Sequence, residues 1–304
     1  MAQTNAITTT QVCTALDQEM IENFAGEYDR LEEILGLFPA ETVAAGTALY
    51  QYKITGALNA TVPAEGESTP LSQYTVRKSF ADELGIKRHA KQTTAEAILK
   101  SGFENAIVKT DKKMLSHLRK LVLGDFFTAL NRGTGALPSG TTAATLQAAI
   151  AQADAVLADA LETAGDEASG IVHFVNPFDI ADYLAAKDVT TQTLFGMTYL
   201  ESFLGVENIL VTNNVAKGKV IVTPVDNIHV RGIDFASLGE SGLSYETEAR
   251  GLIGVHHVPD YDRGSADTYT MVGANFMPEI LNYIVKADIT AAAADSGESA
   301  DSGE

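Results

Sequence analysis

Apolar side chains recur at helical spacing along residues 101–133 of the chain. This period of 3.6 residues predicts one long helix with a single apolar face, spanning about 45 Å. Ser101 and Glu104 have the spacing of a capping box at its start, and Gly133 can take the left-handed conformation that ends a helix. Only residues 110–111 interrupt the stripe, so we expect a strut against which smaller elements pack. The apolar positions of the stripe are Phe103, Ile107, Met114, Leu118, Leu121, Val122, Phe126 and Leu130.

Two segments before this helix alternate between apolar and polar residues, at residues 47–55 and 73–80. Alternation of this kind predicts two half-exposed strands, and the turn-rich, acidic residues 56–72 predict a long connection between them. An extended hairpin of two strands is marginally stable alone, so we expect it to lie on a second subunit or on its own domain. The apolar faces are Ala48, Tyr50, Tyr52 and Ile54 in the first segment, and Tyr74, Val76 and Phe80 in the second.

Helices and strands alternate over residues 135–240, which predicts a compact α/β unit. Its first helix is expected to be capped by Thr141 or Thr142 and to end at Gly165, and Asn176 is expected to cap the helix that follows the first strand. The remaining expected helices are 15–37, 93–100, 177–187 and 198–204. The remaining expected strands are 171–175, 209–212, 220–223, 229–233, 244–258 and 269–272, with a strand or short helix at 280–289.

The charge of the chain is unevenly distributed. The net charge is −19 over 304 residues, yet residues 77–132 hold 12 basic and 6 acidic side chains. This asymmetry is typical of a nucleic-acid patch or of two faces that attract each other between copies of one protein. The overall acidity argues against a dedicated DNA binder, which is usually basic.

No motif for catalysis, for a cofactor or for a metal ion is recognisable, and we assign no residue to such a site. Cys13 is the single cysteine and cannot form an internal disulfide. His256 and His257 fall in a predicted strand, where neighbouring side chains point to opposite faces and cannot share one ion, so we interpret them as structural. No segment is apolar enough for a signal peptide or for a membrane helix, which favours a cytosolic context.

Three short segments and the order of the elements carry a family resemblance. The segments are PAEGESTP at residues 63–70 in the hairpin connection, KQTTAEAI at 91–98 before the long helix, and FVNP at 174–177. Together with the order hairpin, long helix, α/β unit and returning strands, they resemble the major capsid protein of tailed bacteriophages. This is the Hong Kong 97-type fold, which encapsulins share. The resemblance spans residues 15–289 and implies an α+β protein.

The resemblance also implies a division of the chain into the parts of a capsid subunit. The expected parts are an N-terminal arm and helix at 1–45, an extended hairpin loop at 46–92, a spine helix in the peripheral domain at 93–134, an axial domain at 135–240 and peripheral-domain strands at 241–290. The small acidic repeat at 291–304 cannot build a core, so a disordered tail is expected there.

The function that this resemblance implies is structural, not enzymatic. Hexamers and pentamers of the chain are expected to close an icosahedral shell around packaged double-stranded DNA, in a virion capsid assembled in the bacterial cytoplasm. Implied partners are a portal, a decoration protein and a scaffolding protein, the last expected to be separate because the chain begins almost at the arm. Some members crosslink a hairpin lysine to a peripheral asparagine, but no motif selects among Lys53, Lys78, Asn275 and Asn282. The alternatives are an encapsulin-like compartment and a soluble α/β enzyme.

Overall fold

The computed structural model of the chain describes residues 16–20, 34, 36–44, 48–83, 85–186, 208–247 and 250–290. The chain divides into two compact units, and each unit is built from segments that are distant in sequence. The first unit consists of Met1–Leu35, Ala40–Val122 and His229–Glu279, and the second consists of Gly36–Pro39, Leu123–Ile228 and Ile280–Glu304.

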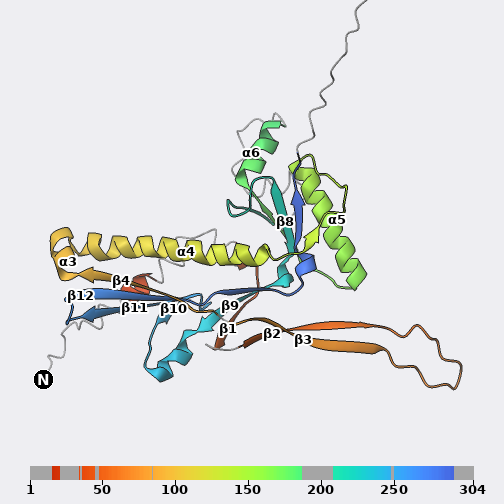
Figure 1. Cartoon of the computed structure of the whole chain (residues 1–304), viewed down its shortest axis with the longest axis horizontal. Coiled ribbons are helices and arrows are strands. Elements are labelled where there is room, and N and C mark those ends of the chain that lie inside the picture. Colours follow the sequence, from red (N-terminus) through yellow and green to blue (C-terminus); the bar gives the residue numbers. More distant parts are fainter. Residues whose placement is uncertain are drawn as a thin grey trace, which may run out of the picture. The chain divides into compact units, whose positions relative to one another are not determined.

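The predicted long helix is present, but it begins later and is interrupted at its start (Figure 1). The α-helix α3 covers Ala95–Ser101, a single π-helical turn follows at Glu104–Val108, and α4 covers Lys109–Leu130. Thr94 caps α3 by accepting a hydrogen bond from the amide of Ala97 at 3.4 Å. The short helix expected before the long one is therefore confirmed.

Two expectations about the ends of the long helix are wrong. Ser101 and Glu104 form no capping box, because Gly102 between them has φ of +79° and ends α3. Gly133 does not take the left-handed conformation. A Cβ at this position would lie 2.5 Å from the side chain of Ile284, so the glycine allows close packing instead.

The apolar stripe of the long helix is largely buried. Leu118 is 3% exposed, and Phe126 and Leu130 are fully buried, as their spacing predicts. Phe103 is the exception at 46% exposed, because it precedes the π-helical turn and leaves the line of the stripe. The interruption of the stripe is also informative, since Asp111 is buried.

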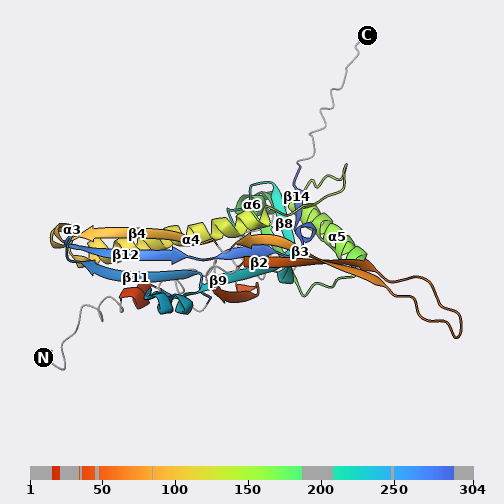
Figure 2. The same ribbon diagram turned by 60° about the horizontal axis from the view of Figure 1, so that its bottom comes forward.

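The main sheet of the first unit is antiparallel and has the strand order β10-β11-β12-β4. Its strands are β10 at Glu246–Thr247, β11 at Ile253–Asp260, β12 at Ser265–Val272 and β4 at Lys87–Thr94. Figure 2 shows β11, β12 and β4 side by side. The turn between β11 and β12 is fixed by Asp260, whose carboxylate accepts hydrogen bonds from the amides of Asp262 and Arg263 at 3.0 and 3.2 Å. The strand β4 lies at the edge of this sheet.

The single strand expected at residues 244–258 is wrong, because the chain is broken between β10 and β11. Gly251 has φ of +63°, which no extended strand contains. A Cβ at Gly251 would lie 2.1 Å from the carbonyl oxygen of Ile233, so this glycine is required by conformation and by space.

The first unit contains a second sheet of three strands, in the order β1-β9-β13. These strands are β1 at Ala40–Ala44, β9 at Ile228–Asp234 and β13 at Asn275–Pro278, and β1 runs parallel to β9. The expectation that residues 229–233 belong to the α/β unit is therefore wrong. Sheet membership depends on long-range pairing, which the local pattern does not contain.

The predicted extended hairpin is confirmed. Strands β2 at Ala48–Ala57 and β3 at Gln73–Glu83 pair antiparallel from Ala48 opposite Glu83 to Ala57 opposite Gln73. Figure 1 shows them as one ribbon that ends in a loop. A register shift between Leu49 and Tyr50 marks an irregularity near the base.

The second unit is a mixed sheet with the strand order β5-β14-β8-β6-β7, against which helix α5 packs (Figure 1).

The final strand of the chain, β14, was expected to join the peripheral strands. This is wrong, because β14 pairs with β8 and β5. The strands are β5 at Gly135–Ala136, β6 at Ile171–Val175, β7 at Ile209–Val211, β8 at Lys219–Pro224 and β14 at Val285–Asp288. The helices are α5 at Leu146–Ala164 and α6 at Pro177–Ala186, and the 3₁₀ turns of the two units are Val225–Asn227, Phe235–Ser241 and Leu281–Tyr283.

Local capping signals in the second unit are mostly confirmed. Asn176 accepts a hydrogen bond from the amide of Phe178 at 2.9 Å and so caps α6. Gly165 ends α5 with φ of +74°. The N-cap of α5 is Thr145, not Thr141 or Thr142, because its hydroxyl is the one that accepts from the amide of Ala148. The helix expected at 198–204, the tail at 291–304, Cys13 and most of the helix expected at 15–37 lie outside the described residues.

Candidate assembly surface

The tip of the hairpin presents large apolar side chains to solvent. Leu58 is 78% exposed, Val62 is 88% exposed and Leu71 is 91% exposed. Tyr74 and Val76, at the start of β3, are also exposed. Apolar side chains gathered on one exposed element are typical of a surface that binds another protein.

The backbone of the tip is ordered by its own hydrogen bonds. The amide of Asn59 donates to the Ser72 hydroxyl at 3.0 Å, and the Asn59 side chain accepts from the amide of Thr61 at 3.0 Å. Ala64 and Glu67 close a turn, in which the amide of Glu67 donates to the carbonyl of Ala64 at 3.0 Å, and Gly66 supplies the positive φ of +89°. A loop fixed in this way loses little conformational entropy when it docks.

The tip is also acidic. Glu65 and Glu67 are exposed on either side of Gly66, and residues 56–72 contain no lysine or arginine. A surface that binds this tip is therefore expected to combine apolar area with positive charge.

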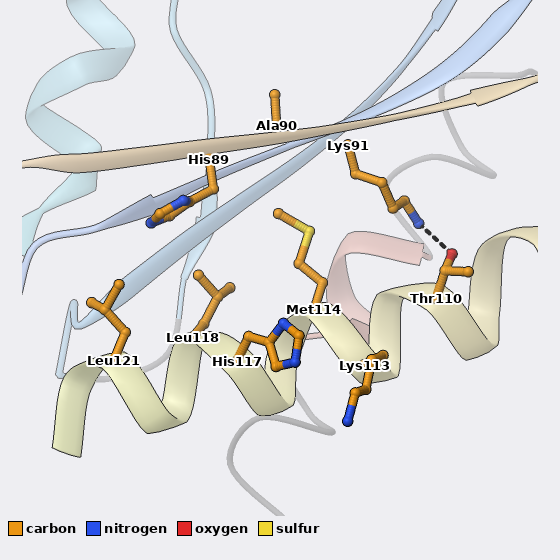
Figure 3. Close-up of a pocket in the computed structure, with 9 residues that line it drawn as sticks. All are labelled: His89, Ala90, Lys91, Thr110, Lys113, Met114, His117, Leu118 and Leu121. Atoms are coloured by element: carbon orange, nitrogen blue, oxygen red, sulfur yellow. Dashed lines mark hydrogen bonds between the residues drawn. The ribbon is translucent and has the colours of Figure 1, made fainter. Parts of the chain in front are cut away.

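A groove with these properties lies between β4 and α4 in the first unit (Figure 3). It has a volume of about 400 Å³. Met114, Leu118 and Leu121 rise from α4 toward β4 and give the groove an apolar floor. His89 and Lys91 reach from β4 toward the helix, whereas Ala90 points away from it.

The rim of the groove carries lysine and histidine side chains. Lys113 and His117 of α4 line it together with His89 and Lys91 of β4. Lys87 lies on the same face of β4, two residues before His89, and is exposed. The positive charge of Lys113 and Lys87 beside an apolar floor is complementary to the exposed apolar and acidic tip of the hairpin.

A buried polar cluster fixes one end of this groove. In the sheet register Lys91 lies opposite Thr268, and Thr268 lies opposite His257, so the three side chains form one row across β4, β12 and β11. Asp111 of α4 meets this row. It forms an ion pair with Lys91, accepts a hydrogen bond from the Thr268 hydroxyl at 3.4 Å and lies 3.3 Å from His257 Nε2. Asp17, from the segment 16–20, hydrogen bonds to the other ring nitrogen of His257.

The charges of this cluster are mutually stabilising. Burial lowers the pKa of His257, but hydrogen bonds to Asp111 and Asp17 and their negative charges outweigh burial and raise that pKa to about 9. Burial raises the pKa of Asp111, but hydrogen bonds from His257 and Lys91 and their charges hold it below its ordinary value. At neutral pH the cluster therefore contains a buried imidazolium and ionised carboxylates, and Lys91 is positioned at the groove by its ion pair.

His256 and His257 lie on opposite faces of β11, as their neighbouring positions in a strand predict. His257 points into the subunit, while His256 lies on the other face of β11 at a ring distance of 6.1 Å from Tyr245. Sequence reasoning missed the roles of Asp17 and Asp111. The one available signal was an acidic residue inside an apolar helical stripe, together with a histidine in a buried strand.

The candidates for a crosslink are placed on separate elements. Lys53 lies in β2 and Lys78 in β3, whereas Asn275 lies in β13 and Asn282 in the turn Leu281–Tyr283.

Among the described residues there is no cluster of histidine, cysteine, aspartate and glutamate that could hold a metal ion. None of the described helices combines the length and the apolar character that crossing a bilayer requires.

No protein-family model and no curated protein matches this sequence. Solved structures do match. The capsid asymmetric unit of cyanophage A-1(L) aligns with a TM-score of 0.57 at 13% identity, covering 85% of this chain and 93% of that chain. A phage-related protein from Bordetella bronchiseptica RB50 aligns at 0.53 and 11% identity, covering 91% and 98%. The virus-like particle from Pyrococcus furiosus aligns at 0.52 and 9% identity, covering 90% and 99%.

These alignments span nearly the whole length of each subunit. The chain is therefore similar in fold to phage capsid proteins, and the resemblance read from the order of its elements is confirmed at the level of the α+β fold. At this identity, fold is what the likeness establishes.

Proposed function

We propose that the chain is the structural major capsid protein of a tailed phage and has no catalytic role. Copies of it self-assemble as hexamers and pentamers into an icosahedral shell around double-stranded DNA. The likeness in fold to the cyanophage A-1(L) capsid supports this function. In this proposal the first unit, with its hairpin, acts as the peripheral domain, and the second unit acts as the axial domain.

The observation that carries the proposal is a pair of complementary surfaces on one chain. The hairpin tip is apolar and acidic at Leu58, Leu71 and Glu67, and the groove between β4 and α4 is apolar with a basic rim. In the shell, the tip of one copy lies in the groove of the next copy. A contact between two different surfaces of identical chains repeats from copy to copy, and a suitable rotation closes it into rings.

Further partners and the location of the protein belong to the same proposal. A portal, a separate scaffolding protein and a decoration protein would act on the assembling shell, and packaged DNA would touch its inner surface without sequence preference. The protein would be assembled in the bacterial cytoplasm and would end in the virion capsid.

A second candidate is an encapsulin-like compartment that encloses protein cargo. The likeness to the virus-like particle from Pyrococcus furiosus supports it as well. The content of purified particles separates the two functions. Particles from infected cells that contain double-stranded DNA support the capsid, and particles that contain a folded enzyme support the compartment.

The experiment that tests self-assembly compares the chain with a variant that lacks the tip. Residues 58–72 are replaced by Asn-Gly, which joins Ala57 to Gln73 through a two-residue hairpin turn and keeps their register. The intact chain should elute as large particles and show closed shells in negative stain. The variant should remain folded by circular dichroism but elute as small species. A matched control, truncation after Thr290, should still form shells. Normal shells from the tip variant would contradict the proposed role of the hairpin.

A further inference from the structure

One buried histidine joins three separate parts of the first unit. The ring of His257 on β11 hydrogen bonds to Asp17 through Nδ1, and its Nε2 lies 3.3 Å from a carboxylate oxygen of Asp111 on α4. All three side chains are buried, with 4% to 6% of each residue exposed. An imidazole can donate to two carboxylates only when both nitrogens carry a proton.

The charges of the cluster also indicate that His257 is an imidazolium. The groups that face His257 from the neighbouring elements are Asp17 of segment 16–20, Asp111 of α4 and the neutral Thr268 of β12. Lys91 of β4 reaches the cluster through Asp111. Two carboxylates are therefore balanced by Lys91 and an imidazolium. Loss of one proton from His257 would leave a buried negative charge uncompensated.

Deprotonation of His257 would destabilise the Asp17 carboxylate more than the Asp111 carboxylate. Asp111 keeps its ion pair with Lys91 and its hydrogen bond with Thr268. Within the part of the chain that the structure describes, the recorded hydrogen-bond partner of Asp17 is His257. A neutral imidazole keeps one N–H and can still donate to Asp17, but it no longer carries the positive charge that compensates this carboxylate. A buried carboxylate without a compensating cation is strongly destabilised and moves toward water.

A small cavity borders the cluster at Asp111. A cavity of about 20 Å³ lies between segment 16–20 and α4, lined by Leu16, Met20, Asp111 and Leu115, with the exposed Glu19 and Lys112 at its border. This volume holds about one water molecule. Met20 is buried beside the cavity and reports on whether segment 16–20 is docked.

We propose that the imidazolium of His257 is a clamp that holds segment 16–20 on the subunit, and that this segment detaches as a unit when the clamp loses its charge, while the sheet and α4 stay folded. The clamp is closed at neutral pH. Through His257, segment 16–20, which precedes the hairpin in sequence, is joined to the cluster that positions Lys91 at the groove. The proposal does not depend on shell formation, because its test is read within one subunit.

The pH range of release follows from the raised pKa of His257, about 9 against the ordinary value of 6.5. A group whose pKa is raised by folding stabilises the docked state fully below the ordinary value, and this stabilisation is lost as the pH rises through the folded value. Segment 16–20 should therefore be docked at pH 6.5 and released progressively toward pH 10.

Methionine oxidation tests the clamp on the full chain, in assembled or free form. Dilute hydrogen peroxide converts accessible thioethers to sulfoxides, which peptide mass spectrometry quantifies for each methionine. Met20 reports on segment 16–20, and the buried Met271 and Met277 report on the strands β12 and β13. Between pH 6.5 and pH 10 the oxidation rate of Met20 should rise at least tenfold relative to Met271.

Two variants test whether docking of segment 16–20 depends on the pair formed by Asp17 and His257. Asp17→Asn removes the carboxylate, so Met20 should be oxidised at pH 6.5 at the rate that the natural chain shows at pH 10. The matched control His256→Gln changes the neighbouring histidine on the other face of β11 and should leave Met20 protected. Three results would overturn the proposal: protection of Met20 up to pH 10, protection in Asp17→Asn, or acceleration of Met20, Met271 and Met277 together, which indicates global unfolding.

Discussion

Lys91 on β4 and Asp111 on α4 form an ion pair that joins the edge strand of the main sheet to the long helix of the first unit. Lys91 also donates to the hydroxyl of Thr110 at 2.8 Å, so its ammonium group is held at the wall of the groove (Figure 3). The pair therefore links the stability of the subunit to the shape of the surface that we propose for assembly.

Removing the carboxylate of this pair should destabilise the subunit. Asp111→Asn leaves Lys91 and His257 without their shared anion, which should lower the free energy of unfolding at pH 7 by about 3–5 kcal/mol. The pKa of Asp111 is held below 3.8, so its contribution is present above that pH and is lost as the pH falls through the lowered value. Urea unfolding at pH 7 and pH 3 should show a smaller loss of stability on acidification in Asp111→Asn than in the natural chain. The exposed Glu96→Gln serves as control, and equal stability of the two variants at pH 7 would count against a structural role for the pair.

The register of the long helix can be tested at Leu118. Leu118→Ala should lower the free energy of unfolding by about 2–5 kcal/mol, because it removes buried apolar area and leaves a cavity. Leu118→Asp should prevent folding, because it buries an unpaired charge. Circular dichroism with urea unfolding measures both. A Leu118→Asp protein that folds and assembles normally would show that this face of α4 is not core.

Two exposed lysines five and six residues before Leu118 should affect association and not folding. Lys112 and Lys113 are both exposed, and Lys113 lines the groove. Reversing both to glutamate should preserve the circular dichroism spectrum but weaken association, most strongly at low salt, where repulsion is least screened. Analytical ultracentrifugation over a series of salt concentrations measures the effect, with the double glutamine variant as the neutral control. Assembly that is unchanged at every salt concentration would exclude an electrostatic contribution from these residues.

Gly251 provides a test of the break between β10 and β11. Gly251→Ala should lower stability by about 1–3 kcal/mol or more, because alanine is strained at φ of +63° and its Cβ would meet the Ile233 carbonyl oxygen. Gly239→Ala is the matched control, since nothing lies within 4 Å of a Cβ there. Thermal unfolding compares the two substitutions. Equal melting temperatures would mean that the break does not require a glycine.

Sequence reasoning succeeded where structure is determined locally. The step from β6 to α6 follows from Asn176 as a cap and the proline after it, and the end of α5 follows from Gly165. The hairpin followed from alternation on both sides of a turn-rich connection. In the first two cases the signal and the structure lie within a few residues of each other, and in the hairpin the two paired strands follow one another directly along the chain.

The remaining expectations failed where distant segments decide the outcome. Whether β9 and β14 join one sheet or another depends on pairing with β1 and β8, which no local pattern encodes. Gly133 was interpreted as a helix stop, although its role is to admit Ile284. The groove depended on β4, whose residues Lys87–Thr94 are too polar to give a strong strand signal.

The central claim is that the hairpin tip of one copy lies in the groove of another, and a charge exchange tests it most directly. One variant carries Glu65→Lys and Glu67→Lys on the tip, a second carries Lys87→Glu and Lys113→Glu at the groove, and a third carries all four changes. All four side chains are exposed, so each variant is expected to fold.

The measurement is the fraction of protein in closed particles, by sedimentation velocity at low salt. The account predicts that each pair of substitutions alone reduces this fraction at least tenfold, and that the fourfold variant restores a major part of it, because opposite charges again face each other. Assembly of both double variants at the level of the natural chain, or a fourfold variant no better than either double variant, would contradict the account.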